Sequence, residues 1–298
     1  MPVFTGAAVA IVTPFGDDDD QRIDYDAFAE LIDYQIANGT DAIVVAGSTG
    51  EASTMTKEEH LQACKFAVEY TKHRVPVIAG SGSNCTRTSA ALSSEIAGYG
   101  ADALLVVTPY YNKGTQEGLY LHYKAIAEAV HGTRIIIYNV PSRTGGNIAP
   151  STVARLVKDF PNIVGIKEAS GLISQVVRLM NATDGNIELY SGNDDQVVPL
   201  LSLGGKGVIS VVSNVAPKIM HEMCADFFAG DIAGAAKLQR DIIPLYDDLF
   251  SEVSPIPVKK AVNLMGFHAG NPRMPLTPMS EEKAAKLEKT MRSMDLIS

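Results

Sequence analysis

The sequence predicts a (β/α)8 barrel, or TIM barrel, followed by a helical appendage at its C-terminal end. Short apolar runs rich in Val and Ile alternate with amphipathic stretches of helical periodicity as far as about Ala216. Eight such runs recur at intervals of roughly 20 to 35 residues, the length of one strand-and-helix unit. Eight units in 298 residues fit a closed barrel. The alternative is a doubly wound open sheet, which is weakened because no GxGxxG motif follows the first run.

The predicted strands are nearly continuous apolar runs, which is typical of a parallel sheet covered on both faces. In chain order they are Ala7–Val12, Ala42–Ala46, Val77–Ala79, Ala103–Val107, Ile135–Tyr138, Ile163–Lys167, Ile187–Tyr190 and Gly207–Ser210. The stretches predicted as helices between them are amphipathic. They are Asp24–Asn38, Lys57–Lys72, Thr86–Tyr99, Gln116–Val130, Pro150–Lys158 and Ile173–Asn181.

No further strand is predicted after about Ala216, and the remaining pattern is helical. The helical stretches are Asp231–Phe250, Pro255–Met265 and Ser280–Ser293. A Pro- and Gly-rich loop, Gly266–Pro278, lies between the last two. We therefore expect a barrel domain over residues 1–230 and a C-terminal helical region over residues 231–298. The four carboxylates of Asp17–Asp20 predict a solvated loop, because they lack the glycine and glutamate spacing of a calcium-binding loop.

The composition argues against several classes of protein. Apolar residues make up 46% of the chain, enough for a large core and too many for a disordered protein. The net charge is −9 and the basic residues are scattered, so neither nucleic acid nor an anionic membrane is an expected partner. The three cysteines and six histidines show neither a disulfide framework nor metal-ligand spacing. Without a signal-peptide pattern or a run of ~18 apolar residues, we expect a soluble cytoplasmic protein.

The stretch Asn162–Ser170 is an apolar run with a single lysine, Lys167, at its far end. Burying an ammonium group without a partner costs several kcal/mol, and deprotonation avoids that cost. A neutral amine in a dry pocket is a nucleophile toward carbonyl groups, so Lys167 is a candidate for catalysis. The alternative is a structural lysine that reaches solvent from the strand end or pairs with Glu168.

Polar side chains and glycines follow most of the predicted strands, at the end where barrel active sites form. These segments are Gly47–Glu51, Gly80–Asn84, Thr108–Asn112, Tyr138–Gly145 and Ser191–Asp194. Their convergence on one rim predicts a site for a small polar ligand.

Three of these positions have a specific chemical interpretation beside a structural one. Gly47–Glu51 offers hydroxyls and N–H groups suited to a carboxylate or phosphate, although a capped turn explains it about as well. Tyr138 precedes Lys167 by one repeat, so it belongs on the adjacent strand as a proton relay or as a packing residue. Arg143 could bind a carboxylate or remain a surface arginine. Lys206 precedes its strand, which places it at the opposite, stabilising end of the barrel.

Together, Gly47–Glu51, Tyr138–Gly145 and Gly165–Ser170 resemble the signature motifs of the dihydrodipicolinate synthase family, within the pyruvate-dependent class I aldolase superfamily. The resemblance covers essentially the whole chain. It implies a (β/α)8 barrel in which Lys167 forms a Schiff base with pyruvate and no cofactor is needed. The resulting enamine would attack aspartate-4-semialdehyde, and the product would cyclise to 4-hydroxy-tetrahydrodipicolinate, for lysine or diaminopimelate biosynthesis.

The resemblance also implies a proton relay of three hydroxyl groups, those of Ser48, Tyr138 and Tyr111. In the family the third member comes from a neighbouring subunit. The resemblance accordingly implies a homotetramer made of two tight dimers.

Substrate-binding roles follow from the same resemblance. Thr49 would help to hold the pyruvate carboxylate, and Arg143 would bind the carboxylate of the second substrate. Gly192 and Ile209 fall on positions whose backbone lines the site.

Other functions remain open at this stage. N-acetylneuraminate lyases and other sugar-acid aldolases use the same Schiff base; Arg143 favours the synthase, whereas Ser48 is a departure toward the lyases. A phosphate- or flavin-binding oxidoreductase of barrel fold explains Lys167 poorly. A silent pyruvate-binding or scaffold protein is disfavoured because the whole set of site residues is present.

Many bacterial synthases of this family are inhibited by lysine at a subunit interface. His60, Asn84 and Tyr110 fall on positions of that allosteric site, whereas Lys57 and Thr88 replace histidine and glutamate. Because Thr88 removes an acceptor for the ammonium of lysine and Lys57 adds a like charge, we expect weak or absent inhibition.

Overall fold

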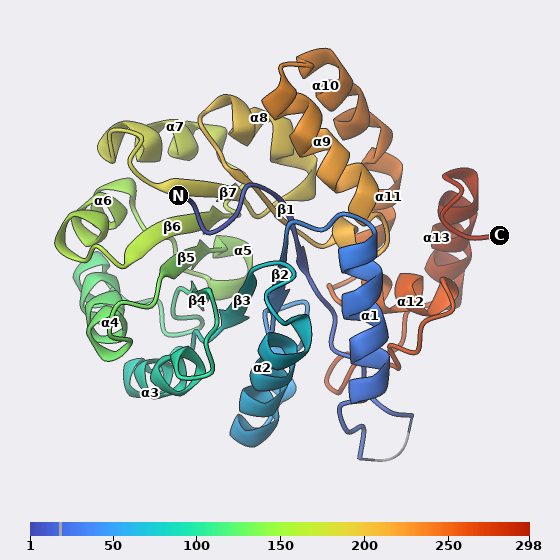
Figure 1. The fold of residues 1–298 in the computed structure, drawn as a ribbon, viewed down its shortest axis with the longest axis horizontal. Helices are drawn as coiled ribbons and strands as arrows, with labels where there is room; N and C mark the ends of the chain where they lie inside the picture. The colour runs from blue at the N-terminus through green and yellow to red at the C-terminus, as the bar shows by residue number, and fades with distance from the viewer. Residues whose placement is uncertain (18–19) are drawn as a thin grey trace.

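The computed structural model describes residues 1–17 and 20–298 and contains a closed barrel of parallel strands in the order β1 to β8 (Figure 1). The strands are β1 (Gly6–Ala10), β2 (Ala42–Val45), β3 (Val77–Gly80), β4 (Ala103–Val107), β5 (Ile135–Asn139), β6 (Ile163–Glu168), β7 (Glu188–Ser191) and β8 (Gly207–Ser210). The predicted fold class is confirmed. Within the predicted loop Asp17–Asp20, Asp18 and Asp19 lie outside the described residues.

The strand bounds agree with the prediction within two residues, and β1 differs most. Ile11 and Val12 were expected in the strand and are buried, but β1 ends at Ala10. The reason is that the N–H of Val12 donates to the side chain of Asn214 at 3.0 Å rather than to a neighbouring strand. The hydrogen-bond ladder of β1 therefore ends before the apolar run does, because Asn214 replaces the neighbouring strand as the partner of Val12.

The predicted helices between the strands are confirmed. They are α1 (Tyr25–Ala37), α2 (Lys57–Thr71), α3 (Thr86–Ala97), α4 (Gln116–Ala129), α6 (Pro150–Asp159) and α7 (Ile173–Ala182). Three helices were not predicted, namely α5 (Pro141–Thr144), α8 (Val197–Ser202) and α9 (Pro217–Ala229). Their sequences are short or mostly apolar, so the helical period is hard to distinguish from a buried loop or strand.

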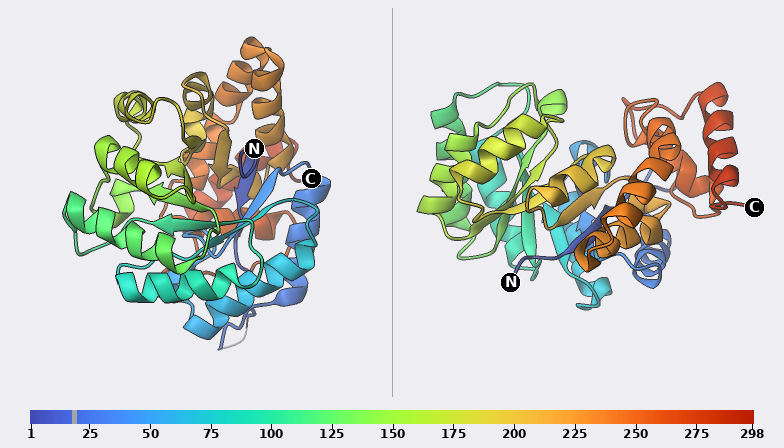
Figure 2. Two further views of the ribbon diagram at one scale, coloured as in Figure 1. Left: turned by 60° about the vertical axis from the view of Figure 1, so that its left-hand side comes forward. Right: turned by 90° about the horizontal axis from the view of Figure 1, so that it is seen from above.

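The C-terminal helices lie on one side of the barrel (Figure 2). The stretch predicted as one helix over Asp231–Phe250 is two, α10 (Ile232–Asp241) and α11 (Ile243–Leu249), and Pro244 lies in the first turn of the second. α12 (Ile256–Leu264) and α13 (Glu281–Ser293) lie before and after the predicted loop Gly266–Pro278, and α13 packs mainly on α11 and α12. Because α10 packs closely against α9, a domain boundary at residue 231 stays a prediction.

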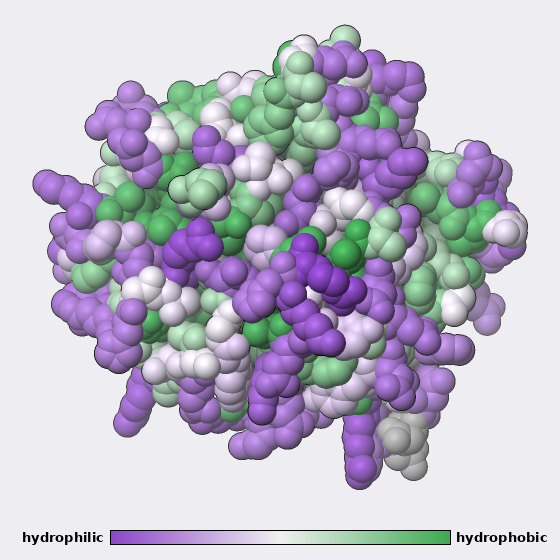
Figure 3. Space-filling model, in the orientation of Figure 1, coloured by the Kyte–Doolittle hydropathy of each residue, from purple (hydrophilic) through white to green (hydrophobic). Residues whose placement is uncertain are grey.

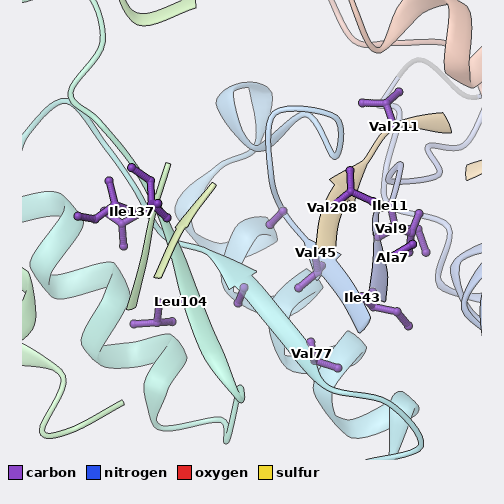
Figure 4. Packing of buried hydrophobic residues seen from close by; sticks show 14 of the residues in the cluster. Ala7, Val9, Ile11, Ile43, Val45, Val77, Leu104, Ile137, Val208 and Val211 are labelled. Atoms are coloured by element: carbon purple, nitrogen blue, oxygen red, sulfur yellow. The ribbon is translucent and has the colours of Figure 1, made fainter. Parts of the chain in front are cut away.

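Alternate residues of each strand face two different apolar layers. Ala7 and Val9 of β1 belong to the layer between the barrel and its helices, which Figure 4 shows from close by. Ala8 and Ala10 belong to a smaller cluster inside the barrel that also contains Tyr138. The strand alternation thus decides which side chains can reach a site at the barrel mouth.

The outer surface shown in Figure 3 is largely hydrophilic, with scattered apolar side chains. Among the helices of the described ranges, none combines the length and the apolar composition needed to cross a membrane.

Candidate active site

Lys167 lies near the C-terminal end of β6 and points into the barrel. It pairs in register with Tyr138 of β5 and Tyr190 of β7, and side chains at paired positions of a parallel sheet share a face. Its side chain is 5% exposed, and its Nζ lies 4.5 Å from the centroid of the Tyr138 ring. Both groups line a cavity of about 400 Å³. The amine is therefore hidden from bulk solvent but open to a small ligand.

The structural interpretation of Lys167 as a partner of Glu168 is wrong. The Glu168 carboxylate accepts hydrogen bonds from Asn139 at 3.1 Å, the Ser170 backbone N–H at 2.7 Å and Gln175 at 3.2 Å. Adjacent residues of a strand face opposite sides of the sheet, so Glu168 is directed away from Lys167. A lysine that reaches bulk solvent is excluded by its burial.

Burial lowers the pKa of Lys167 to about 8, the Asp194 carboxylate opposes this shift, and the Arg143 guanidinium adds to it. At neutral pH roughly a tenth of such an amine is unprotonated, against less than a thousandth for an exposed lysine. Lys167 can therefore act as a nucleophile without a separate base.

The hydroxyl groups next to Lys167 are placed for proton transfer. Burial raises the pKa of Tyr138, so its phenol stays protonated at neutral pH, although Arg143 and the Ser48 hydroxyl beside it act in the opposite direction. Ser48 and Thr49 follow β2 and line the same cavity as Lys167. Together with Arg143, which lines the same cavity, the geometry thus brings five of the predicted polar residues to one place.

Gly192, after β7, gives the Lys167 side chain its space. A Cβ at this position would lie 3.2 Å from Lys167 Cε and 2.6 Å from Ala169 Cβ. Its N–H donates to the Glu168 carbonyl at 2.8 Å, which fixes the backbone there. Ile209, by contrast, is fully buried in β8 within the inner cluster, and its role in the site stays a prediction.

Arg143 extends from α5 over the cavity. Pro141 opens this short helix and Gly145, with φ of +72°, closes it in the left-handed conformation that glycine tolerates. The Arg143 Nη2 donates to the Ser254 carbonyl at 3.0 Å, and the side chain lines the cavity. The other N–H groups of the Arg143 guanidinium can therefore bind an anion in the cavity.

One part of the site was missed by sequence reasoning, and the role of one predicted rim residue was not recognised. The C-terminal segment before α12 forms one wall of the cavity with Phe250, Glu252, Val253 and Ser254. No local signal connects that segment to Lys167. Asp194 belongs to the predicted rim segment Ser191–Asp194, but its effect on the pKa of Lys167 was not predicted; it is 1% exposed and accepts the Val211 N–H at 3.0 Å.

Tyr111 is separate from the other predicted residues in this chain. It is 88% exposed, and it lines neither the cavity of Lys167 nor the larger cavity that adjoins it. Its backbone has φ of +73°, and its N–H donates to the Thr144 carbonyl at 3.0 Å. A contribution of Tyr111 to a neighbouring subunit stays a prediction.

A second cavity of about 810 Å³ adjoins the first and shares Ser48, Tyr138 and Arg143 with it. Four of the five predicted allosteric residues line it, namely Lys57, His60, Thr88 and Tyr110.

Contacts around this second cavity set the charge of its lining. Burial lowers the pKa of His60, whose Nε2 lies 2.7 Å from the Gly80 carbonyl. Lys57 pairs with Glu95 at 2.5 Å. Asn84 lies outside the lining, and its carbonyl accepts from Asn112 at 2.9 Å.

The described residues contain no cluster of three or more His, Cys, Asp or Glu side chains that could hold a metal ion. In the cavity of Lys167, the groups that could bind an anionic ligand are hydroxyls, the Lys167 amine and the Arg143 guanidinium, which suit an α-keto acid and a second carboxylate.

Comparisons with known proteins agree with this chemistry. The sequence model of the Dihydrodipicolinate synthetase family matches residues 3–294. The 4-hydroxy-tetrahydrodipicolinate synthase of Lachnoclostridium phytofermentans is 54% identical over 297 residues and covers 100% of both chains. The crystal structure of the chloride-inhibited dihydrodipicolinate synthase of Acinetobacter baumannii complexed with pyruvate has a TM-score of 0.94, 45% identity and coverage of 98% of this chain and 99% of that one. The enzyme of Cyanidioschyzon merolae with lysine bound has a TM-score of 0.96 and 36% identity, with 100% of both chains covered. This chain belongs to the dihydrodipicolinate synthetase family.

Proposed function

We propose that this chain condenses pyruvate with L-aspartate-4-semialdehyde, through a Schiff base on Lys167, to give 4-hydroxy-tetrahydrodipicolinate. The observation that carries the mechanism is a buried lysine with a pKa of about 8, directed into a cavity rather than toward a carboxylate. The relatives from Lachnoclostridium phytofermentans and Acinetobacter baumannii are both synthases, which decides against the sugar-acid aldolase that the sequence left open. The product would serve lysine or diaminopimelate biosynthesis.

The first half of the reaction uses the cavity around Lys167. The unprotonated amine attacks the keto carbon of pyruvate, and the carbinolamine loses water to give a protonated imine. Ser48 and Tyr138 would carry the protons that these steps move. Thr49 and the N–H groups of the Gly47–Glu51 loop would hold the pyruvate carboxylate. Loss of a methyl proton then gives the enamine that forms the new carbon–carbon bond.

The second substrate would bind where Arg143 enters the cavity. Its carboxylate fits the guanidinium fork, and its aldehyde carbon then faces the enamine. We further propose a cytoplasmic homotetramer of two tight dimers in which Tyr111 completes the relay of a neighbouring subunit. Its exposed ring supports this assembly. Sedimentation velocity tests it, and an active monomer would contradict the role of Tyr111.

Borohydride trapping tests the proposed chemistry. We expect pyruvate and borohydride to add one reduced pyruvyl group to the wild-type chain, and peptide mapping to place it on Lys167. The variant Lys167→Met should give no adduct, whereas Lys206→Met, at the opposite end of the barrel, should give the wild-type amount. Aspartate-4-semialdehyde should diminish the adduct, and N-acetylmannosamine should not. An adduct on another residue, or none, would refute the mechanism.

We also propose that lysine inhibits this enzyme weakly or not at all. The support is the lining of the second cavity, where Lys57 adds a cation and Thr88 offers no carboxylate. The pairing of Lys57 with Glu95 offsets part of that charge, so Thr88 carries more of the argument. Initial rates at rising lysine concentration test the proposal, and half-inhibition at micromolar to low-millimolar lysine would contradict it.

A further inference from the structure

A buried network of charged groups joins the C-terminal region to the loop after β2, and none of its members lines the cavity of Lys167. Lys259 of α12 is 0% exposed, and its Nζ donates to Glu51 Oε1 at 2.9 Å and to the Asn271 carbonyl at 3.2 Å. The other oxygen of Glu51 accepts the backbone N–H of Arg273 at 2.9 Å. Both oxygens of this buried carboxylate are therefore held by the C-terminal region.

The side chain of Arg273 extends the network to α2. Its guanidinium donates to the Glu59 carboxylate at 2.6 and 2.9 Å. The guanidinium carbon lies 4.0 Å from the centroid of the Phe15 ring, and Lys259 Nζ lies 4.2 Å from the same centroid. Two cations thus share one aromatic ring, and each is matched by one carboxylate. The network is balanced in charge, so loss of one member leaves its partner uncompensated.

The loop attached to this network has a strained backbone. Ala46 and Glu51 have φ of +51° and +56°, in the left-handed region that residues other than glycine rarely adopt. They bracket the segment that contains Ser48 and Thr49. The Glu51 N–H donates to the Ser48 carbonyl at 3.2 Å, and the Thr13 hydroxyl donates to the Gly50 carbonyl at 2.8 Å. Strained backbone persists only where the surrounding structure holds it, and here Glu51 is the attachment point.

We infer that Lys259 is a positioning residue for the reaction, which acts through Glu51 to fix the loop that presents Ser48 and Thr49 to pyruvate. The inference rests on the proposed function, because those two residues have a role only if pyruvate binds beside Lys167. Without the ammonium group, the buried Glu51 carboxylate loses its cation and the loop can leave its strained conformation. Arg143 is held by the Ser254 carbonyl and not by the Glu51 loop, so binding of the second substrate should depend on Lys259 less than binding of pyruvate does.

The test compares Lys259→Met with the double variant Lys259→Met/Glu51→Gln, which also removes the charge left unpaired. Lys260→Met is the matched control, because Lys260 is the next residue of α12 and is only half-buried. Steady-state kinetics gives separate KM values for the two substrates, and the melting temperature of each sample reports its stability. We expect Lys259→Met to raise KM for pyruvate about tenfold, while KM for the semialdehyde changes less than about threefold. In the double variant, the melting temperature recovers but KM for pyruvate stays raised.

A merely structural ion pair gives a different pattern, in which KM for pyruvate returns to the wild-type value together with the melting temperature. That result overturns the inference, as does an unchanged KM for pyruvate in folded Lys259→Met. If Lys259→Met does not fold, the double variant carries the same test, because it contains no unpaired buried charge. Borohydride trapping of the wild type separates the two proposals. A wild type without an adduct refutes the proposed function, whereas a normal adduct with unchanged KM refutes only the role of Lys259.

Discussion

Lys167 and Lys259 are both buried lysines, and burial lowers the pKa of each to about 8. Their surroundings differ. Lys259 has the Glu51 carboxylate at 2.9 Å and a backbone carbonyl at 3.2 Å, so its ammonium is bound on all sides by protein. Lys167 makes no ion pair or hydrogen bond with the other described residues; its Nζ lies 4.5 Å from the centroid of the Tyr138 ring and faces an open cavity, and Asp194 and Arg143 act on it only at longer range. A low pKa alone therefore does not identify a nucleophile; the amine must also be free of a carboxylate partner and accessible to a carbonyl.

The largest expected difference between the two lysines is in turnover. We expect Lys167→Met to lose at least about 10³-fold in kcat/KM, because no other amine can form the covalent intermediate. Lys259→Met keeps the nucleophile and should still form the pyruvyl adduct at high pyruvate. The rate at which aspartate-4-semialdehyde is consumed gives kcat/KM for both variants, with Lys206→Met as the control. Residual activity of Lys167→Met near the wild-type value would show that the two lysines do not differ in the proposed way.

The second difference is in stability, where Lys259→Met should destabilise the protein by about 3–5 kcal/mol. Removing one partner of a buried ion pair leaves the other charge without compensation. Here that charge is Glu51, whose side chain is 1% exposed. The melting temperature at fixed protein concentration measures the effect, with Lys260→Met as control. A loss below about 1 kcal/mol would mean that water reaches Glu51 when the ammonium is gone.

The role of Lys167 could be predicted from the sequence, whereas that of Lys259 could not, because Lys259 is far along the chain from its partner. Lys167 ends an apolar strand, and the order of the strands places it on the same rim as Ser48 and Tyr138, so local pattern and fold class were sufficient. Lys259 lies beside Lys260 in an amphipathic helix, and its partner Glu51 is 208 residues away in sequence. Nothing local distinguishes the buried member of that lysine pair.

The walls of the site show the same limit. The residues after each strand were predictable because parallel strands deliver their ends to one rim. The segment Phe250–Ser254 reaches the cavity only through the packing of α11 and α12, which tertiary contacts decide. The extra helix α9 was missed for a related reason, since its mostly apolar sequence has weak periodicity.

Replacement of Lys167 should have the opposite effect on stability from replacement of Lys259. The pKa of Lys167 falls from 10.5 to about 8 on folding, which corresponds to a cost of roughly 3 kcal/mol for holding the ammonium at neutral pH. Because the unfolded chain binds the proton more tightly, that cost is complete below about pH 8 and disappears as the pH rises past the unfolded value.

We therefore expect Lys167→Met to raise the free energy of unfolding at neutral pH by up to roughly 3 kcal/mol, and by less as the pH rises above about 8. Urea unfolding at two pH values measures this. A destabilised Lys167→Met at neutral pH would mean that the amine makes a favourable contact that its burial does not reveal.

The smallest expected effect is a change of rate with pH, and it separates the two lysines even though burial lowers the pKa of both to a similar value. Attack on pyruvate needs the unprotonated form of Lys167, so the trapping rate at low pyruvate should rise about tenfold per pH unit and level off above about pH 8. Burial raises the pKa of Tyr138, so the phenol should not limit the rate in that range. Lys259→Met should lower the rate without moving the inflection, because Lys259 does not line the cavity where the amine reacts. A shifted inflection in Lys259→Met would mean that the titration of Lys259, rather than that of Lys167, controls the reaction.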